Sequence, residues 1–171
     1  VHRAAERTRP LPIGGLRFSP DGHWIALTTW GDDRVHPSPD HRLILIPVTG
    51  RTSESRTIPL PRGPVRLANA IHWSPNSDFA VIGLAGGLVA VVRIHDGRTC
   101  RAEAVINDVA GFAGPDFWVG TKTNPNVNPR AHGVQSSTVS VIRTDCTILA
   151  QWKFRGNARV AESSAFPSLV A

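Results

Sequence analysis

The sequence predicts an all-β protein built from repeated sheets of four antiparallel strands. An octapeptide of the form Arg-Thr-x-Pro-Leu-Pro-x-Gly occurs at residues 7–14 and again at residues 56–63. A second motif follows each copy, at residues 15–27 and 70–82. No segment carries a sustained 3.6-residue apolar period between helix-capping residues. Repetition on this scale is typical of repeat architectures, and the absence of helical patterning makes strands the repeated element.

The second motif predicts a tight corner between two strands. Its two copies, GLRFSPDGHWIAL and AIHWSPNSDFAVI, share an aromatic residue, then Ser-Pro and a polar residue, then an aromatic-led apolar run. Proline presets φ, the Asp or Asn side chain bonds the local backbone, and Gly accepts a positive φ. A weaker third copy occupies residues 109–120, and a fourth begins within 163–171. The equivalent repeat positions are Phe18, Pro20, Trp73, Pro75, Phe112 and Pro115. We expect the three aromatic residues among them to be buried between adjacent sheets.

Each repeat continues with three more strand-like runs, rich in β-branched residues. These runs are 24–30, 42–48 and 56–60, then 79–85, 88–94 and 101–106, then 117–121, 137–143 and 148–154. Four strands with two apolar faces cannot bury themselves alone, so such sheets must stack on one another.

Several of these segments resemble the WD40-like and TolB-like (PD40-type) β-propellers. The matching segments are FSPDG at 18–22, WSPNS at 73–77, and the strand–turn pairs at 43–50 and 89–97. The resemblance covers nearly the whole chain, but there is no Gly-His pair opening a repeat and no Trp-Asp pair closing the third strand. It therefore indicates a divergent propeller, and it implies a fold more than a function, because propellers host many roles.

The resemblance also implies a domain organisation. It divides the chain into an outer strand of a preceding blade (1–14), three blades (15–60, 65–106 and 109–154) and the start of a further blade (158–171). Propellers close with about four to eight blades. We therefore expect a partial propeller, completed by blades of a longer polypeptide or of a partner chain. A chain that begins at Val1 and contains no methionine also suggests a trimmed or excised segment.

The charge of the chain is +6, and 17 of its 19 basic residues are arginine. These are scattered singly except for Arg3, Arg7 and Arg9, which favours a solvated surface over a dedicated polyanion site. Aromatic residues do not alternate with the arginines as in RNA-binding motifs. Nucleic-acid binding is therefore the less favoured alternative. No apolar run approaches the length of a membrane helix.

The two cysteines, Cys100 and Cys146, are too few for a disulfide scaffold and lack metal-ligand spacing. The sequence does not reveal their redox state or the compartment, and we favour an intracellular protein of the cytoplasm or nucleus.

Two long connectors, 30–42 and 121–137, are the candidate interaction loops. The first holds carboxylates and imidazoles that could bind a metal, but its prolines and irregular spacing favour an ordinary solvated loop. The second is either a functional loop or a surface insertion. The candidate interaction residues are Asp32, Asp33, Arg34, His36, Asp40, Lys122, Asn126, Arg130 and His132.

No pattern in the sequence indicates catalysis. The serines lack a G-x-S-x-G setting. The segment GLAGG at 83–87 lacks the Lys and the helix of a phosphate loop, and we expect His72 to be structural. We therefore predict no catalytic residue, cofactor, metal or small-molecule ligand.

Three functional hypotheses follow. The leading one is a non-enzymatic scaffold that binds a protein partner or the remaining blades. The second is a propeller domain that supports or gates a hydrolase or peptidase whose catalytic part lies outside this segment. The third is nucleic-acid binding through arginine, which would weaken steeply with salt.

Overall fold

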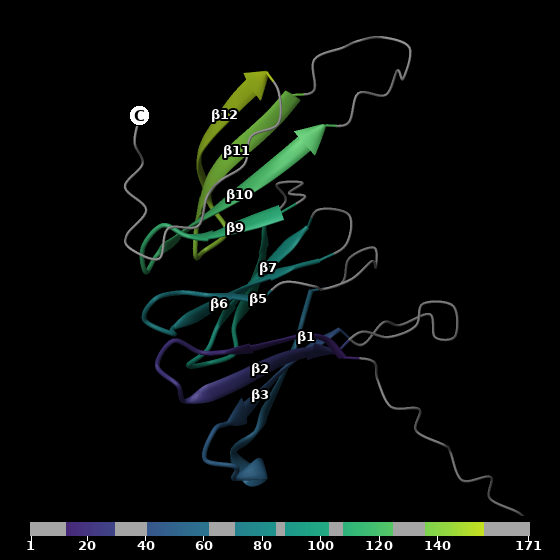
Figure 1. Cartoon of the computed structure of the whole chain (residues 1–171), viewed down its shortest axis with the longest axis vertical. Helices are drawn as coiled ribbons and strands as arrows, with labels where there is room; N and C mark the ends of the chain where they lie inside the picture. Colours follow the sequence, from purple (N-terminus) through teal and green to yellow (C-terminus); the bar gives the residue numbers. More distant parts are fainter. Residues whose placement is uncertain are drawn as a thin grey trace, which may run out of the picture.

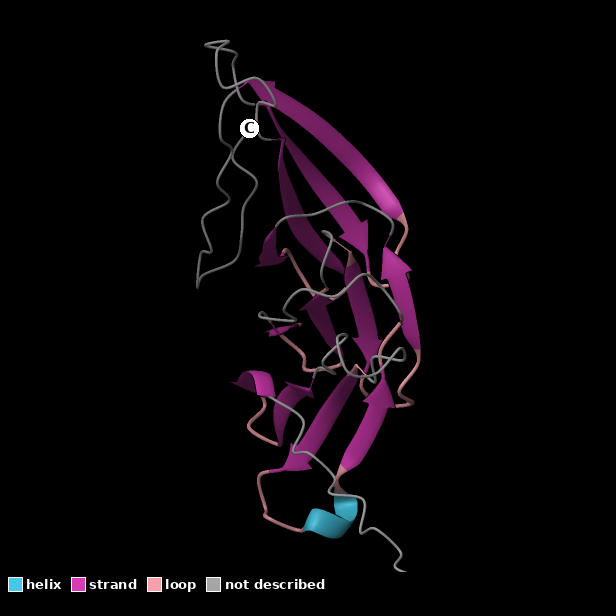
Figure 2. Cartoon of the chain, turned by 90° about the vertical axis from the view of Figure 1, so that its right-hand side faces the viewer, coloured by secondary structure: helices cyan, strands magenta, loops and turns pink. Residues whose placement is uncertain are grey.

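The computed structural model describes residues 13–29, 41–61, 71–84, 88–102, 108–124 and 136–155. These residues form three four-stranded antiparallel sheets, which confirms the predicted all-β class. The sheets are stacked along the long axis of the molecule (Figure 1). Strands dominate the side view, and a short helical turn lies at the end occupied by the first sheet (Figure 2).

Strand order follows chain order in every sheet, so each sheet is a simple meander. The first contains β1 (Ile13–Phe18), β2 (Trp24–Thr29), β3 (Arg42–Pro47), the 3₁₀ turn η1 (Thr52–Glu54) and β4 (Arg56–Pro59). The second contains β5 (Ile71–Trp73), β6 (Phe79–Gly83), β7 (Val89–Arg93) and β8 (Thr99–Ala102). The third contains β9 (Asp108–Phe112), β10 (Phe117–Asn124), β11 (Ser136–Arg143) and β12 (Ile148–Arg155). We call these sheets the first, second and third blade.

The corner between the first two strands forms as its residues predict. In the first blade, the Ser19 hydroxyl accepts a hydrogen bond from the Trp24 amide at 2.9 Å. In the second, the Ser74 hydroxyl accepts one from the Phe79 amide at 2.9 Å. Gly22 takes the left-handed conformation that closes the first corner, with φ of 72°. The short polar loop therefore fixes the hairpin, as expected for a serine-proline turn.

The core lies at the two interfaces between blades. One cluster joins the first and second blades through Ala26, Leu43, Leu45, Ile58, Leu60, Ile71, Ala80, Ile82, Ala90, Val92 and Ile94. The other joins the second and third blades through Val81, Val89, Val91, Ala102, Trp118 and Ile142. Successive residues of a strand point to opposite faces. The middle blade therefore buries both faces of β6 and β7, because it has a neighbour on each side.

The three equivalent aromatic residues do not share one environment. Trp73 packs against the first core cluster and Phe112 against the second. Phe18 is 60% exposed, so the expectation that it is buried is wrong. The reason is its position: Trp73 and Phe112 each contact the blade before their own, whereas no described sheet precedes the blade of Phe18.

The two tryptophans of the third blade should respond oppositely to truncation. Trp118 is fully buried in the second cluster, whereas Trp152 is 44% exposed. Trp118→Ala should lower the free energy of unfolding by about 3 to 5 kcal/mol, because it removes a large side chain from a packed core. Trp152→Ala should cost less than about 1 kcal/mol. Urea unfolding measures both, and equal losses would contradict the assigned interface.

Candidate interaction surface

An arginine on the outer strand of the first blade ties that strand to the second blade. Arg56 lies on β4, and its guanidinium donates to the carbonyl oxygens of Ile94, at 3.3 Å, and His95, at 3.1 Å. Both acceptors lie in the turn between β7 and β8. The guanidinium also stacks 5.4 Å from the ring centroid of Trp24. The side chain thus combines a cation–π contact with hydrogen bonds across the interface.

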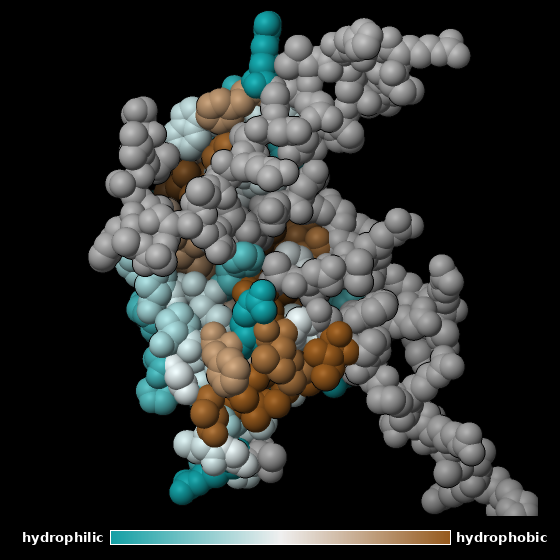
Figure 3. Space-filling model, viewed as in Figure 1, coloured by the Kyte–Doolittle hydropathy of each residue, from teal (hydrophilic) through white to brown (hydrophobic). Residues whose placement is uncertain are grey.

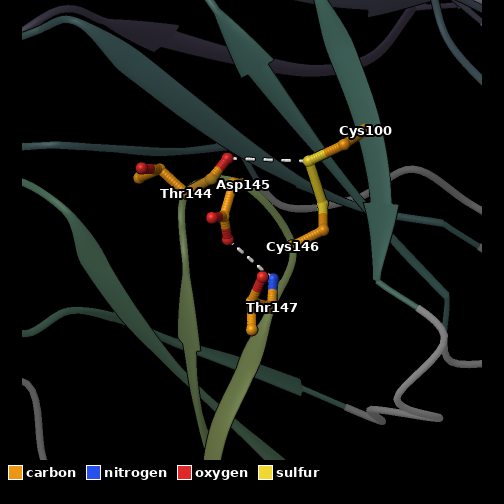
Figure 4. The surroundings of a disulfide bond; sticks show 5 residues. All are labelled: Cys100, Thr144, Asp145, Cys146 and Thr147. Carbon is orange, nitrogen blue, oxygen red and sulfur yellow. Dashed lines mark hydrogen bonds between the residues drawn. A yellow bond between two sulfur atoms is a disulfide. The ribbon is translucent and has the colours of Figure 1, made fainter.

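A disulfide ties the outer strand of the second blade to the third. Cys100 lies on β8 and is bonded to Cys146, in the turn between β11 and β12, with their Cα atoms 6.1 Å apart. The Cys100 sulfur also lies 3.5 Å from the carbonyl oxygen of Thr144 in the same turn (Figure 4). The two residues are 46 positions apart in the sequence, so the bond crosses from one repeat to the next.

Carboxylates stabilise the turns beside these contacts. Burial raises the pKa of Asp21, but hydrogen bonds from the Ser19 hydroxyl and the His23 backbone amide outweigh it and lower the pKa to about 2. In the second blade, hydrogen bonding and charge from Arg93 hold the pKa of Asp96 at about 2. The Asp145 pKa is also lowered, chiefly by hydrogen bonds from Thr147.

All the exposed large hydrophobic side chains among the described residues belong to the two end blades. They are Ile13, Leu16, Phe18 and Val48 in the first blade, and Ile148, Leu149, Trp152 and Phe154 in the third. Figure 3 shows apolar residues gathered over the first blade, where β1–β3 lie in Figure 1. An exposed apolar patch of this kind marks an interaction site more often than an ordinary surface.

The exposed residues of β1 continue into an apolar patch across β2 and β3. Phe18 pairs with Ile25, and Ile25 pairs with Ile46. Leu16 pairs in the same way with Leu27, and Leu27 with Ile44. Directly paired residues of antiparallel strands project from the same face. We call these six residues, Leu16, Phe18, Ile25, Leu27, Ile44 and Ile46, the first-blade face.

The opposite end of the stack carries a matching face. Trp152 pairs with Val139, and Val141 pairs with both Val119 and Ala150. These residues lie on the side of the sheet opposite Trp118 and Ile142, which pack against the second blade. We call Val119, Val139, Val141, Ala150, Trp152 and Phe154 the third-blade face. It combines half-buried valines with two exposed aromatic rings.

Only one of the nine candidate loop residues lies within the described residues. Asp32, Asp33, Arg34, His36, Asp40, Asn126, Arg130 and His132 lie outside the described residues. Lys122 lies in β10 and is half-buried, so it belongs to a strand and not to a loop. The prolines Pro20, Pro75 and Pro115 are exposed at the corners.

Within the described ranges, no three His, Cys, Asp or Glu side chains gather as metal ligands. No described helix is long and apolar enough to cross a membrane.

Sequence reasoning missed the residues that join the blades. Arg56 was visible only as the first letter of the repeated octapeptide. Cys100 and Cys146 were visible only as two cysteines in neighbouring repeats. The signal available for the disulfide was that the outer strand of one repeat and the turn of the next each carry one cysteine.

No protein-family model matches the sequence, and no curated protein matches it either. The fold is similar to that of U3-55K, with a TM-score of 0.57 and 14% identity, covering 85% of this chain and 40% of that one. It is also similar to the WD40 repeats of RRP9, with a TM-score of 0.56, 14% identity, and coverage of 85% and 39%. A third likeness is to Pyrococcus horikoshii acylaminoacyl peptidase, with a TM-score of 0.62, 10% identity, and coverage of 86% and 26%.

These likenesses, at 14% identity or less, concern the fold. They confirm the fold expected from the corner motifs: the three sheets are similar to blades of known β-propellers. The chain spans about 40% of the length of U3-55K and of the RRP9 structure.

Removing the Arg56 guanidinium should weaken the first interface. Arg56→Gln should lower the free energy of unfolding by about 1 to 3 kcal/mol, because it loses two charged hydrogen bonds and a cation–π contact. Arg56→Lys should lose less, since it keeps the charge but not the planar fork. Arg17→Gln is the control, because the exposed Arg17 side chain bonds the carbonyl of its own neighbour, Leu16. A loss at Arg17 as large as that at Arg56 would refute the assignment.

The lowered pKa values of Asp21 and Asp96 predict acid sensitivity. Their folded pKa values, about 2, lie below the usual aspartate value of 3.8, so the ionised carboxylates stabilise the fold. This contribution should be complete above about pH 5 and should disappear as the pH falls through 3.8 toward 2. Urea midpoints measured between pH 6 and pH 2 test this. The urea midpoint of Asp21→Asn should fall less steeply with decreasing pH than that of the wild type. A wild-type midpoint that stays constant down to pH 2 would contradict the prediction.

Proposed function

We propose that this chain is a non-enzymatic scaffold: blades of a larger β-propeller that bind protein through their end faces. The observation that carries the proposal is the distribution of exposed apolar residues. Every exposed large hydrophobic side chain in the described residues belongs to an end blade, and the middle blade has none. On an ordinary solvent-exposed surface such residues are scattered singly. In a stack of blades whose end faces are covered by further sheets, they are concentrated at the two ends.

The internal interfaces indicate what would cover the first-blade face. Trp73 and Phe112 lie on the equivalent faces of their blades and pack against the preceding blade. In the first interface, the surface that Trp73 meets contains the small and branched side chains of Ala26, Leu43 and Leu45. The partner that fits the first-blade face is therefore a protein β-sheet with alternating aliphatic residues.

The domain organisation expected from the sequence belongs to this proposal. Residues 1–14 would supply an outer strand to a preceding blade, residues 15–60, 65–106 and 109–154 would form three blades, and residues 158–171 would open another. Since propellers close with about four to eight blades, the remaining blades would come from a longer polypeptide or from a partner chain. The partial coverage of the similar propellers supports this view.

A second candidate function is supported by the likeness to an acylaminoacyl peptidase. In this version the same blades would support or gate a hydrolase located outside the segment. A serine-reactive fluorophosphonate probe distinguishes the two. Labelling of the full polypeptide at a serine outside residues 1–171 would favour the hydrolase, and no labelling would favour the scaffold.

The compartment also remains a proposal. The cytoplasm or nucleus, favoured from the sequence, would keep thiols reduced, and disulfides persist mainly in oxidising compartments. The bond between Cys100 and Cys146 therefore favours an oxidising compartment over the cytoplasm or nucleus.

Site-specific photocrosslinking tests the scaffold function. A benzophenone amino acid replaces Phe18, on the first-blade face, or Arg17, which projects from the opposite face of the same strand. In cells that make the full polypeptide, position 18 should crosslink to side chains on one face of another β-sheet, identified by peptide mass spectrometry. Position 17 is on the face that packs against the second blade, so any crosslink that it forms to a β-sheet should stay within residues 71–102 of this chain. Crosslinks to a sheet outside this chain that are as frequent from position 17 as from position 18 would overturn the proposal. So would the absence of any crosslink from position 18.

A further inference from the structure

The outer strands of the first and second blades carry their interblade contacts at one equivalent position. Arg56 of β4 pairs with Leu45 of β3, and Cys100 of β8 pairs with Val91 of β7. Leu45 and Val91 are themselves equivalent, because each is buried and faces the next blade. The two outer-strand residues therefore occupy the same place in successive repeats, although one is a cation and the other a thiol-derived sulfur.

Backbone hydrogen bonds confirm the alignment of the turns that receive these contacts. The amides of Val48, Ile94 and Thr144 each donate to the corner of their own blade, at 2.9, 2.8 and 2.9 Å. Ile94 and Thr144 are thus equivalent turn residues. Arg56 contacts the carbonyl oxygen of Ile94, and Cys100 lies against the carbonyl oxygen of Thr144. Both contacts therefore reach the same point on the following blade.

Cys146 stands at a turn position that is occupied by glycine in the other two blades. The corresponding turns of the first two blades place glycine in the left-handed conformation, Gly50 at φ 76° and, in a turn one residue longer, Gly97 at φ 69°. Cys146 adopts φ 70° in the third, a conformation that is unfavourable for a residue with a Cβ. A Cβ added at Gly97 would lie 3.5 Å from Ile58 of the preceding blade. A side chain at this turn position therefore points back across the interface, which is where Cys146 meets Cys100.

From this replacement we infer that the Cys100–Cys146 disulfide is a redox-controlled latch on the third blade. Strained backbone of this kind is retained where the side chain has a task. A dithiol reductant supplies two electrons: its thiolate attacks one sulfur, the S–S bond breaks, and the resulting mixed disulfide is resolved by the second thiol. Cys100 and Cys146 end as protonated thiols, and the reductant ends as a cyclic disulfide.

Reduction should loosen the third blade without unfolding the stack. The apolar side chains Val81, Val89, Val91, Trp118 and Ile142 still pack across the interface. What is lost is the covalent contact at the outer edge, so local opening of β9–β12 becomes easier while the first interface keeps Arg56. The latch would thus adjust how readily the third blade separates from the second.

The test compares the oxidised and dithiothreitol-reduced chain. Alkylation of the two cysteines should follow dithiothreitol treatment under native conditions, because both are only half-buried. The melting temperature should then fall by about 5 to 15 °C. Hydrogen exchange should accelerate in β9–β12 and remain unchanged in β1–β4. Alkylation that requires denaturant, an unchanged melting temperature, or exchange that accelerates equally in all blades would overturn the latch.

Two double variants separate the latch from a general loss of packing. Cys100→Ser with Cys146→Gly should melt somewhat above the reduced wild type, because glycine suits the left-handed turn, and its melting should not change with the reductant. Cys100→Arg with Cys146→Gly rebuilds the first interface at the second, since Phe79 occupies the position of Trp24 beneath the guanidinium. It should melt above the serine variant and also ignore the reductant. Equal melting of the two variants would overturn the equivalence with Arg56.

Discussion

The constraint on which the rest of the structure depends is that each four-stranded sheet has two apolar faces and must have both covered. The middle blade meets this condition, and its central strands are buried except at their end residues Phe79, Gly83 and Arg93. The end blades meet it on one side only. Burial of apolar area stabilises at about 25 cal/mol per Å². The interfaces between blades, more than any single blade, therefore hold the fold together, and a residue's environment depends on which neighbour its sheet has.

Strands and corners were predictable from sequence because their causes are local. Runs of β-branched residues such as those of β3 and β7 favour strands, and Ser-Pro corners close them. Phe18 was misjudged because it shares every local feature with Trp73 and differs only in what lies against its sheet. Whether a residue is buried at a blade interface depends on two sheets. It therefore cannot be predicted from the sequence pattern of one repeat.

The contacts between blades were hidden from sequence for a different reason. Arg56 and Cys100 share a register position but no chemistry, so comparing the letters of the repeats does not align them. The two residues can be aligned only from the pairing of their strands, which places each of them opposite an equivalent core residue. The same holds for Cys146 and Gly97, whose equivalence lies in the backbone conformation of the turn. The residues at these positions differ chemically between the blades, whereas their geometry is shared.

Apolar packing and edge contacts have separate tasks in such a stack. Aliphatic faces attract without direction, so by themselves they would tolerate a rotation of one blade on the next. The Arg56 guanidinium, which donates from Nη1 to two carbonyl oxygens, or a disulfide ties the outer edge and so opposes such a rotation. Ala150 occupies the position of Arg56 and Cys100 in the third blade, because it pairs with Val141 on β11. It has no group that could reach a following turn. Any blade beyond the third would thus be held by the exposed rings of Trp152 and Phe154, without a fixed outer edge.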